Sequence, residues 1–281
     1  MSTEETTGTP PRCVAPPAAS AKEPAVWAFL RDTLALADVE LRKLKRDPLE
    51  LLTRAIQPAL WLLIFGQVFG RIKAIPTGNQ SYLTFMVPGI LAQSVLFIAI
   101  FYGISVIWER DLGILQKLLV TPAPRSALVL GKALSAGVRG LSQGFIIYLL
   151  ALILRIPIRI EVQAMVGVAG FIILGSALFS TFSLAVACLV RTRERFMGVG
   201  QVLTMPLFFT SNAIYPLSIM PAWLRALAKV NPLSYQVDAL RVLMVQGGQS
   251  IFGLGKDFTV LLLGLMVLVL ITARLYPNVV R

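Results

Sequence analysis

Gly131 and Lys132 are the residues of this chain that come closest to a phosphate-binding pattern. A G-x-x-x-x-G-K-[ST] run binds the phosphates of a nucleotide through backbone N–H groups, a lysine and a Mg²⁺-binding hydroxyl. Here Ala133 follows the lysine, and Ser126 stands where the first glycine would be. The run therefore lacks two of the required residues, and we expect that this chain cannot hydrolyse ATP alone.

The chain also has few residues that could bind a metal or carry out thiol chemistry. The chain contains no histidine and two cysteines, Cys13 and Cys188. Cys13 lies in a Pro-rich stretch and Cys188 in an apolar run, so neither a metal cluster nor a disulfide framework is available. We expect no catalytic residue, no metal and no cofactor in this chain.

The composition is that of a protein whose solvent is lipid. Of 281 residues, 56% are hydrophobic and only 14% are charged, and the mean hydropathy is +0.76. Soluble domains carry charges at about a quarter of their positions. The net charge is +12, but no run of basic residues is long enough to form a groove for nucleic acid. Attraction of the Lys and Arg side chains to anionic lipid headgroups is the simpler explanation of this charge.

An all-α protein with six membrane-spanning helices is the expected fold. A helix crosses the hydrocarbon core in about 20 residues, and Arg54 and Arg274 can snorkel to the interface at helix ends. Lys and Arg concentrate on the side of the N-terminus, which predicts that both termini are cytoplasmic in a multi-pass protein of the cell membrane. The expected spans are 51–70, 82–107, 130–154, 162–190, 196–216 and 258–276.

Two N-terminal segments precede the membrane domain of residues 48–281. Residues 1–24 combine prolines with Ser, Thr and Ala, which predicts a disordered cytoplasmic tail. Residues 25–47 carry apolar side chains at spacings of three and four, typical of an amphipathic helix in the headgroup plane, and Asp47-Pro48 would end it. A helix packed on a soluble domain is the alternative, but no such domain remains in the sequence. The apolar face comprises Trp27, Leu30, Leu34, Ala37, Leu41 and Leu44.

The loop at 108–125 has the pattern of a docking surface. It mixes charges with Leu112, Leu115, Leu118 and Leu119, and Pro122 would end a short amphipathic helix there. Such a helix can sit in a groove of a partner and pass its motion to the attached spans. A solvated loop that only joins two spans explains the same residues equally well.

The segment at 216–246 is apolar but too interrupted to cross a membrane. Pro216 and Pro221 break it, and Asn231-Pro232 separates two expected short helices at 223–230 and 235–245. Backbone that enters the bilayer and returns must be buried by protein or face a wet cavity. We expect two re-entrant helices on the outer side, with a plain extracellular loop as the alternative.

Arg139 is the one charge near the middle of an expected span. A charge at that depth costs about 2.5–3.5 kcal/mol on insertion scales, so it should face protein or a wet cavity and could line a substrate path. If the third span starts near Ala136, Arg139 lies instead at its cytoplasmic end. Small residues at Gly167, Gly170 and 175–177 indicate close helix packing in the fourth span.

The run ERDLGILQKLLVTPAPRSALVLGK at 109–132 resembles the signature cytoplasmic loop of type-2 ABC transporter permeases, the drug-resistance and polysaccharide exporter group. Two further segments match in the same order, 45–58 and 212–241. The resemblance implies a coupling helix that contacts the ATPase, a connecting helix beside it, and an outer lid of re-entrant helices. The coupling residues are Glu109, Arg110, Gly113, Leu115, Leu118, Pro122, Gly131 and Lys132; the connecting-helix residues are Trp27, Leu30, Leu34, Leu41 and Arg46; the lid residues are Pro216, Pro221, Trp223, Asn231, Pro232, Tyr235 and Arg241.

As such a permease, the chain would export an amphipathic substrate such as a drug, a lipid, a lipid-linked glycan or a peptide. The resemblance implies a dimer with a second permease subunit and two copies of a separate ABC ATPase that bind ATP and Mg²⁺. An ion-coupled transporter is a competing reading, but the expected spans contain no Asp, Glu or His away from their ends. A membrane anchor for an ATPase, without transport, is a third.

Overall fold

A computed structural model describes residues 53, 56–72, 75, 80–112, 125–190 and 192–275 of the chain. This part is helical, as expected, and it contains a single isolated bridge between Ile158 and Val245. An apolar helix, Ile56–Ile72, includes a π-helical turn η1 (Trp61–Phe65) and ends with α3 (Gly66–Ile72). The following elements are α4 (Tyr82–Tyr102), α5 (Ile104–Asp111), α7 (Arg125–Ile153), α8 (Val162–Leu189), α9 (Arg193–Phe209), η2 (Leu217–Ile219), α10 (Ala222–Val230), α11 (Pro232–Met244) and α12 (Leu254–Leu275).

Four helices are long and apolar enough to cross a membrane: α4, α7 from Val129 onward, α8 and α12. The first expected span is described from Ile56 as a shorter apolar helix of 17 residues. The fifth, α9, also has 17 residues and begins with Arg193, Glu194 and Arg195. Six helices thus occur near the expected positions, whereas the count of six spans stays a prediction.

The second expected span, 82–107, ends earlier than predicted. α4 stops at Tyr102, and α5 begins at Ile104 after Gly103. The Ser183 hydroxyl of α8 donates a hydrogen bond to the Ile100 carbonyl, the group that the backbone N–H of Ile104 would otherwise use. A Cβ at Gly103 would lie 2.1 Å from Ser183 Oγ, so this close approach of α4 and α8 requires glycine.

The fifth expected span, 196–216, is also too long, because α9 ends at Phe209. The Ser211 hydroxyl donates to the Phe208 carbonyl at 2.7 Å, and the Asn212 carbonyl accepts a hydrogen bond from Arg241. Side chains thus bond backbone groups at the end of the helix and just beyond it. The helix thus ends seven residues before Pro216, the residue expected to end it.

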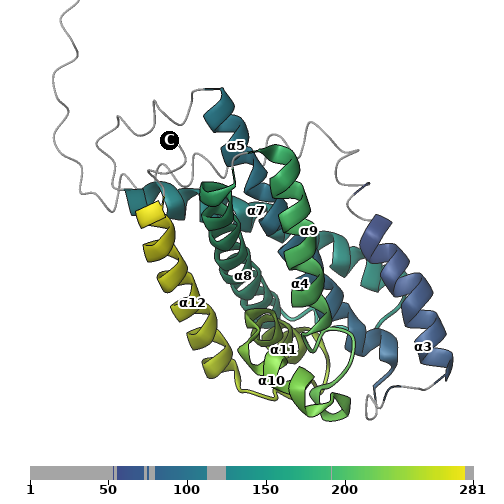
Figure 1. Cartoon of the computed structure of the whole chain (residues 1–281). Coiled ribbons are helices and arrows are strands. Elements are labelled where there is room, and N and C mark those ends of the chain that lie inside the picture. The colour runs from purple at the N-terminus through teal and green to yellow at the C-terminus, as the bar shows by residue number, and fades with distance from the viewer. Residues whose placement is uncertain are drawn as a thin grey trace, which may run out of the picture.

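α4 and α8 form the centre of the bundle, and α12 lies at its edge (Figure 1). Most of the side chains of α4 and α8 are buried, whereas few of those on α12 are. The exposed side of α12 is apolar, with Leu263, Met266, Val267 and Leu270. Apolar side chains on that scale are stable when lipid surrounds them.

The small residues of α8 have different surroundings. A Cβ at Gly175 would lie 2.3 Å from the Gln236 side chain of α11, so α8 and α11 touch closely there. Gly170, in contrast, has open space around it. A Cβ at Gly167 would lie 3.1 Å from the Leu243 side chain of α11. Close packing through small residues therefore holds at Gly167 and Gly175 and not at Gly170.

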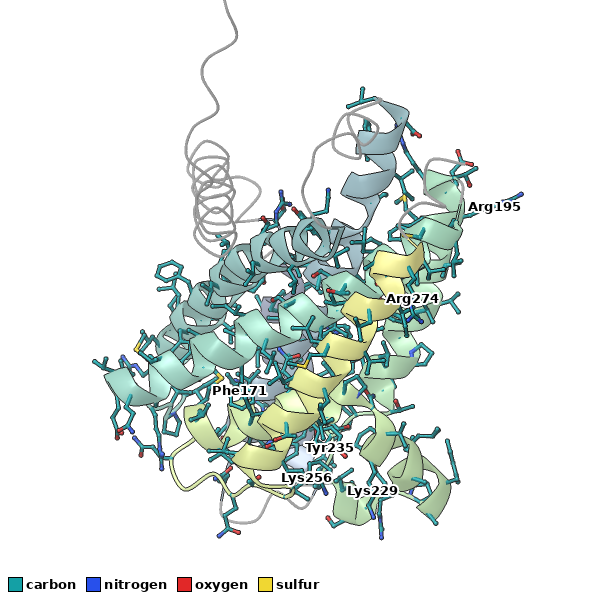
Figure 2. All side chains as sticks on the ribbon, turned by 90° about the vertical axis from the view of Figure 1, so that its left-hand side faces the viewer. Phe171, Arg195, Lys229, Tyr235, Lys256 and Arg274 are labelled. Carbon is teal, nitrogen blue, oxygen red and sulfur yellow. The ribbon has the colours of Figure 1, made fainter. Side chains whose placement is uncertain are left out.

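The two ends of the bundle differ. α5, the start of α9 and the end of α12 lie at one end, and α10 with the start of α11 lies at the other (Figure 1). Figure 2 shows Arg195 and Arg274 at the first end and Lys229, Tyr235 and Lys256 at the second. We call these the coupling end and the lid end.

Candidate functional site

At the coupling end, α5 and α9 are joined by one arginine. Arg193 Nη2 lies 2.7 Å from Asp111 Oδ2, and Arg193 Nε donates to the same oxygen at 3.0 Å. The guanidinium also stacks over the Trp108 ring, 3.6 Å from its centroid. The pair is about one-third exposed, so its contribution to stability is small, about 0.2–1 kcal/mol. Its role is geometric, because it sets where the last turn of α5 lies against the first turn of α9.

The predicted coupling residues are only partly placed. Glu109 and Arg110 belong to α5, but their side chains lie outside the described part of the chain. Gly131 and Lys132 lie within α7, where Ser135 Oγ donates to the Gly131 carbonyl at 3.0 Å. Lys132 borders a small gap beside Tyr102. Gly131 and Lys132 thus belong to a helix of the bundle and not to a loop. Four coupling residues and all five connecting-helix residues lie outside the described residues: Gly113, Leu115, Leu118, Pro122, Trp27, Leu30, Leu34, Leu41 and Arg46.

Arg139 lies in the middle of α7. The helix starts at Arg125, ahead of both expected starts of the third span, so the depth of Arg139 in the membrane stays a prediction. The Arg139 guanidinium lies 5.1 Å from the centroid of the Tyr102 ring on α4. A cation–π contact of this kind stabilises a desolvated cation by about 2 kcal/mol.

Gln143, one turn beyond Arg139, is a polar residue that the sequence did not single out. It is 1% exposed, and neither polar atom of its amide has a hydrogen-bond partner among the described residues. It borders a cavity of about 260 Å³ together with Gln57, Ser94 and Phe97. An unpaired buried amide costs about 1–3 kcal/mol, so a water or ligand in this cavity that bonded the Gln143 amide would be stabilising.

At the lid end, Asn231 and Pro232 separate α10 from α11, as the sequence predicts. The Asn231 side chain accepts from the Leu233 N–H at 2.9 Å and so caps α11, whose first residue is Pro232. Its amide also donates to the Leu207 carbonyl at 2.6 Å and to Thr210 Oγ1 at 3.0 Å. The Asn231 side chain therefore caps α11 and ties it to the end of α9, while the Asn231 backbone N–H bonds the Leu227 carbonyl at the end of α10.

The remaining predicted lid residues frame this junction. Pro216 precedes η2 and Pro221 precedes α10, while Trp223 of α10 is exposed. The Tyr235 hydroxyl of α11 donates to the Lys229 carbonyl of α10 at 2.6 Å. The Tyr215 hydroxyl donates a hydrogen bond to the Phe209 carbonyl at the end of α9.

α11 is more deeply buried than a surface lid would be. Its residues 233–241 are all buried, and it packs against α4, α8 and α12. Arg241 stacks over the Phe85 ring at 3.9 Å, and its Nη2 donates to the Asn212 carbonyl at 2.8 Å. A plain extracellular loop, the alternative reading, does not describe a helix with this burial.

Two buried acids lie at the same end, although they were not among the predicted site residues. Asp238 and Asp257 are both 0% exposed. The Asp238 carboxylate accepts from Ser250 Oγ at 2.6 Å and from the N–H groups of Ile251 and Phe252 at 2.9 and 3.1 Å. It thereby holds the turn between α11 and α12. Asp238 and Arg241 are three residues apart, which puts them on one face of a short helix. This spacing was the feature of the sequence that could have predicted a buried polar site here.

The fold and these two ends define a helical membrane protein. Among the helices that run between its opposite surfaces, α9 has a side-chain hydrogen bond to α5 at its start and to Asn231 at its other end. The sequence pattern of the ABC-2 type transporter family matches residues 31–245. The chain belongs to the ABC-2 type transporter permeases, which are membrane proteins that are generally non-catalytic and work with an ABC ATPase.

Three relatives illustrate the family. A putative transport permease, ycf38, of Cyanophora paradoxa is 31% identical over 76% of this chain and 74% of its own length. The daunorubicin resistance ABC transporter permease protein DrrB1 of Streptomyces coeruleorubidus is 26% identical over 83% of this chain and 82% of its own. The inner membrane transport permease YadH of Escherichia coli K12 is 25% identical over 66% and 73%.

Proposed function

We infer that this chain is the permease subunit of an ATP-driven exporter whose ATPase is a separate polypeptide. Two permease subunits and two ATPase subunits form the working complex in the cell membrane, with both termini in the cytoplasm. ATP and Mg²⁺ bind to the ATPase. The substrate is amphipathic, in the class of drugs, lipids, lipid-linked glycans and peptides.

The observation that carries this proposal is the position of α9 between the coupling and lid ends. Arg193 at its start bonds Asp111, the last residue of α5, which belongs to the predicted docking segment at 108–125. At its other end, the Leu207 carbonyl and the Thr210 hydroxyl bond Asn231 of the lid. A displacement of α5 therefore reaches the α10–α11 junction through a single helix.

The packing of α9 suits this role. Its buried residues form one stripe at a spacing of four, and its other faces carry exposed side chains such as Val202 and Phe209. The stripe consists of Phe196, Gly200, Thr204 and Phe208. A helix held along one narrow face can shift by shear more easily than the central helices α4 and α8, which are buried on several sides.

The test is transport by the reconstituted complex. The chain and its ATPase, co-purified and placed in vesicles, should move a fluorescent amphipathic substrate only when ATP is hydrolysed. Transport that an ion gradient drives without ATP would instead support an ion-coupled transporter. ATPase binding without any substrate flux would support a membrane anchor.

A further inference from the structure

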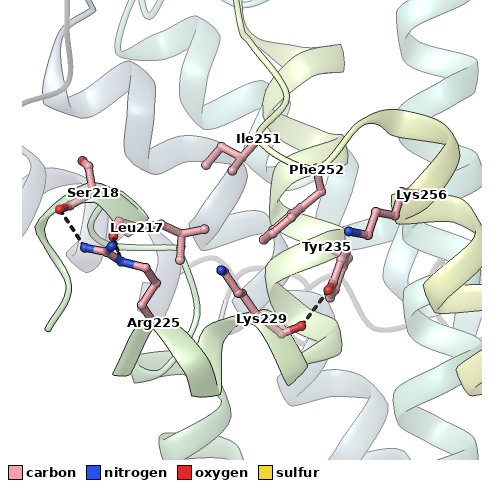
Figure 3. Close-up of a pocket in the computed structure, with 8 residues that line it drawn as sticks. All are labelled: Leu217, Ser218, Arg225, Lys229, Tyr235, Ile251, Phe252 and Lys256. Atoms are coloured by element: carbon pink, nitrogen blue, oxygen red, sulfur yellow. Dashed lines mark hydrogen bonds between the residues drawn. The ribbon is translucent and has the colours of Figure 1, made fainter. Parts of the chain in front are cut away.

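The lid end contains a cavity of about 540 Å³ with a strongly positive lining (Figure 3). Three cations border it, Arg225, Lys229 and Lys256, and none of the lining residues is acidic. Two aromatic side chains, Tyr235 and Phe252, form a further part of the wall. Their ring centroids are 4.6 Å apart.

The three cations differ in what they already bind. The Arg225 guanidinium donates to the carbonyls of Leu217, Ser218 and Met220 at 3.0–3.3 Å, so it builds the wall of the cavity. Lys229 and Lys256 form no ion pair among the described residues. Figure 3 shows these two lysines on either side of the aromatic pair. Their ammonium groups are therefore the donors left for a ligand.

The helix start beside the cavity carries charges of both signs. Lys256 lies in the first turn of α12, where the backbone N–H groups carry partial positive charge. Asp257 of the same turn offsets part of this charge, but it is 0% exposed and does not line the cavity, whereas Lys256 does. The site thus favours a negatively charged group over a neutral one.

The position of the cavity indicates a ligand with an apolar part. α10 exposes Trp223, Leu227 and Val230 on one stripe, whereas Arg225 and Lys229 lie on the opposite side of the helix. An amphipathic helix of this kind lies at a membrane interface, and tryptophan is enriched there. The cations then meet headgroups, while the aromatic pair offers contact to a less polar portion.

We propose that this cavity binds the phosphate group of an anionic amphipathic molecule at the lid end of the permease. As a statement about the transported substrate, the assignment rests on the proposed export function. As a statement about binding, it does not, because the cavity is complete within one chain. The shared chemistry is a phosphate held by Lys229 and Lys256, whether it comes from a lipid headgroup or from free phosphate.

Binding is tested with the full chain in nanodiscs of phosphatidylcholine, without the ATPase, titrated with phosphatidylglycerol that carries a fluorescent acyl chain. We expect saturable binding that weakens about 30-fold in K229Q/K256Q, from about fivefold for each cation near an anionic headgroup. K229R/K256R keeps both charges and should retain the affinity within about threefold. R71Q/R155Q removes the same net charge from exposed residues outside the cavity and should change nothing.

A second arm separates the two sources of phosphate. Displacement of the probe by inorganic phosphate assigns the site to the phosphate alone, and its failure to displace assigns the site to the whole lipid. Absent saturable binding, or an equal loss in K229Q/K256Q and R71Q/R155Q, overturns the proposal. Because no ATP enters the assay, loss of the export activity would leave this result untouched.

Discussion

Arg193 Nη2 and Asp111 Oδ2 lie 2.7 Å apart and join the start of α9 to the end of α5. The two residues are 82 positions apart in the chain. With the Trp108 ring beneath the guanidinium, they form the described contact between the coupling end and the helix that leads to the lid. The consequences of this geometry can be measured.

Asp111→Asn and Arg193→Gln should each lower substrate flux per ATP hydrolysed while leaving insertion unchanged. The exposed pair and the cation–π contact contribute at most about 2 kcal/mol together, so the chain still folds. The exchange Asp111→Arg/Arg193→Asp restores the ion pair and should recover part of the flux ratio. Glu194→Gln, an exposed neighbour, is the control. Unchanged coupling in both single variants would reject the α9 pathway.

The bundle should cross the membrane with its coupling end in the cytoplasm. Single cysteines at Thr192 and Ser250, in a chain lacking Cys13 and Cys188, report on the two ends. A membrane-impermeant maleimide should label Thr192→Cys only from the cytoplasm and Ser250→Cys only from outside. Labelling of Thr192→Cys from outside would remove the proposed orientation and the predicted count of six spans.

Replacing Asn231-Pro232 with Ala-Ala should fuse α10 and α11 into a more continuous helix. The change removes the cap, worth about 1 kcal/mol, and restores an N–H at position 232 for the Ala228 carbonyl. It also breaks the ties to Leu207 and Thr210. We expect normal insertion, retained ATP hydrolysis and flux reduced several-fold in reconstituted vesicles.

Pro232→Ala alone is the matched control for that variant, because it keeps every hydrogen bond of the Asn231 side chain. It should transport nearly as well as the unaltered chain. An unchanged flux per ATP in the Ala-Ala variant would show that the junction does not control exit.

Asp238→Asn should destabilise the chain by about 1–3 kcal/mol. The carboxylate accepts from three donors, and an amide would turn its own N–H groups toward some of them. Ser250→Ala removes one of the three bonds and should cost about 1 kcal/mol or less. Unfolding midpoints in detergent measure both, and equal midpoints for Asp238→Asn and the unaltered chain would contradict the structural role.

Gln143→Leu separates a role in transport from a role in packing, because the two roles predict different changes in stability and in substrate flux. The Gln143 amide is buried and has no partner in the part of the chain that the structure describes, so an apolar side chain of similar size should leave stability equal or higher. If the cavity beside Gln57 and Ser94 carries substrate, flux should fall at the same time. Phe145→Leu, on the exposed side of α7, is the control for membrane packing. If Gln143→Leu leaves the flux unchanged, this cavity is not part of the substrate path.

Local patterns in the sequence determined the helical class, the approximate helix positions and the break at Asn231-Pro232. Apolar length governs insertion of a helix, and proline cannot donate within one, so these features depend on neighbouring residues. The family resemblance also lay in contiguous runs. The helix ends at Tyr102 and Phe209 were missed, because distant side chains bond the backbone near them: Ser183 bonds the Ile100 carbonyl and Arg241 bonds the Asn212 carbonyl.

Only the tertiary structure decided which polar residues meet. Asp111 pairs with Arg193, the Asn231 side chain bonds the Leu207 carbonyl, and Lys229 and Lys256 line the same cavity. The two members of each pair belong to different helices or helix caps. In the sequence these residues read as isolated charges and amides with no stated partner. Their meaning depends on helix packing, which brings together residues that no periodicity links. The burial of α11 could not be predicted from the sequence either, since it comes from α4, α8 and α12 packed around this helix.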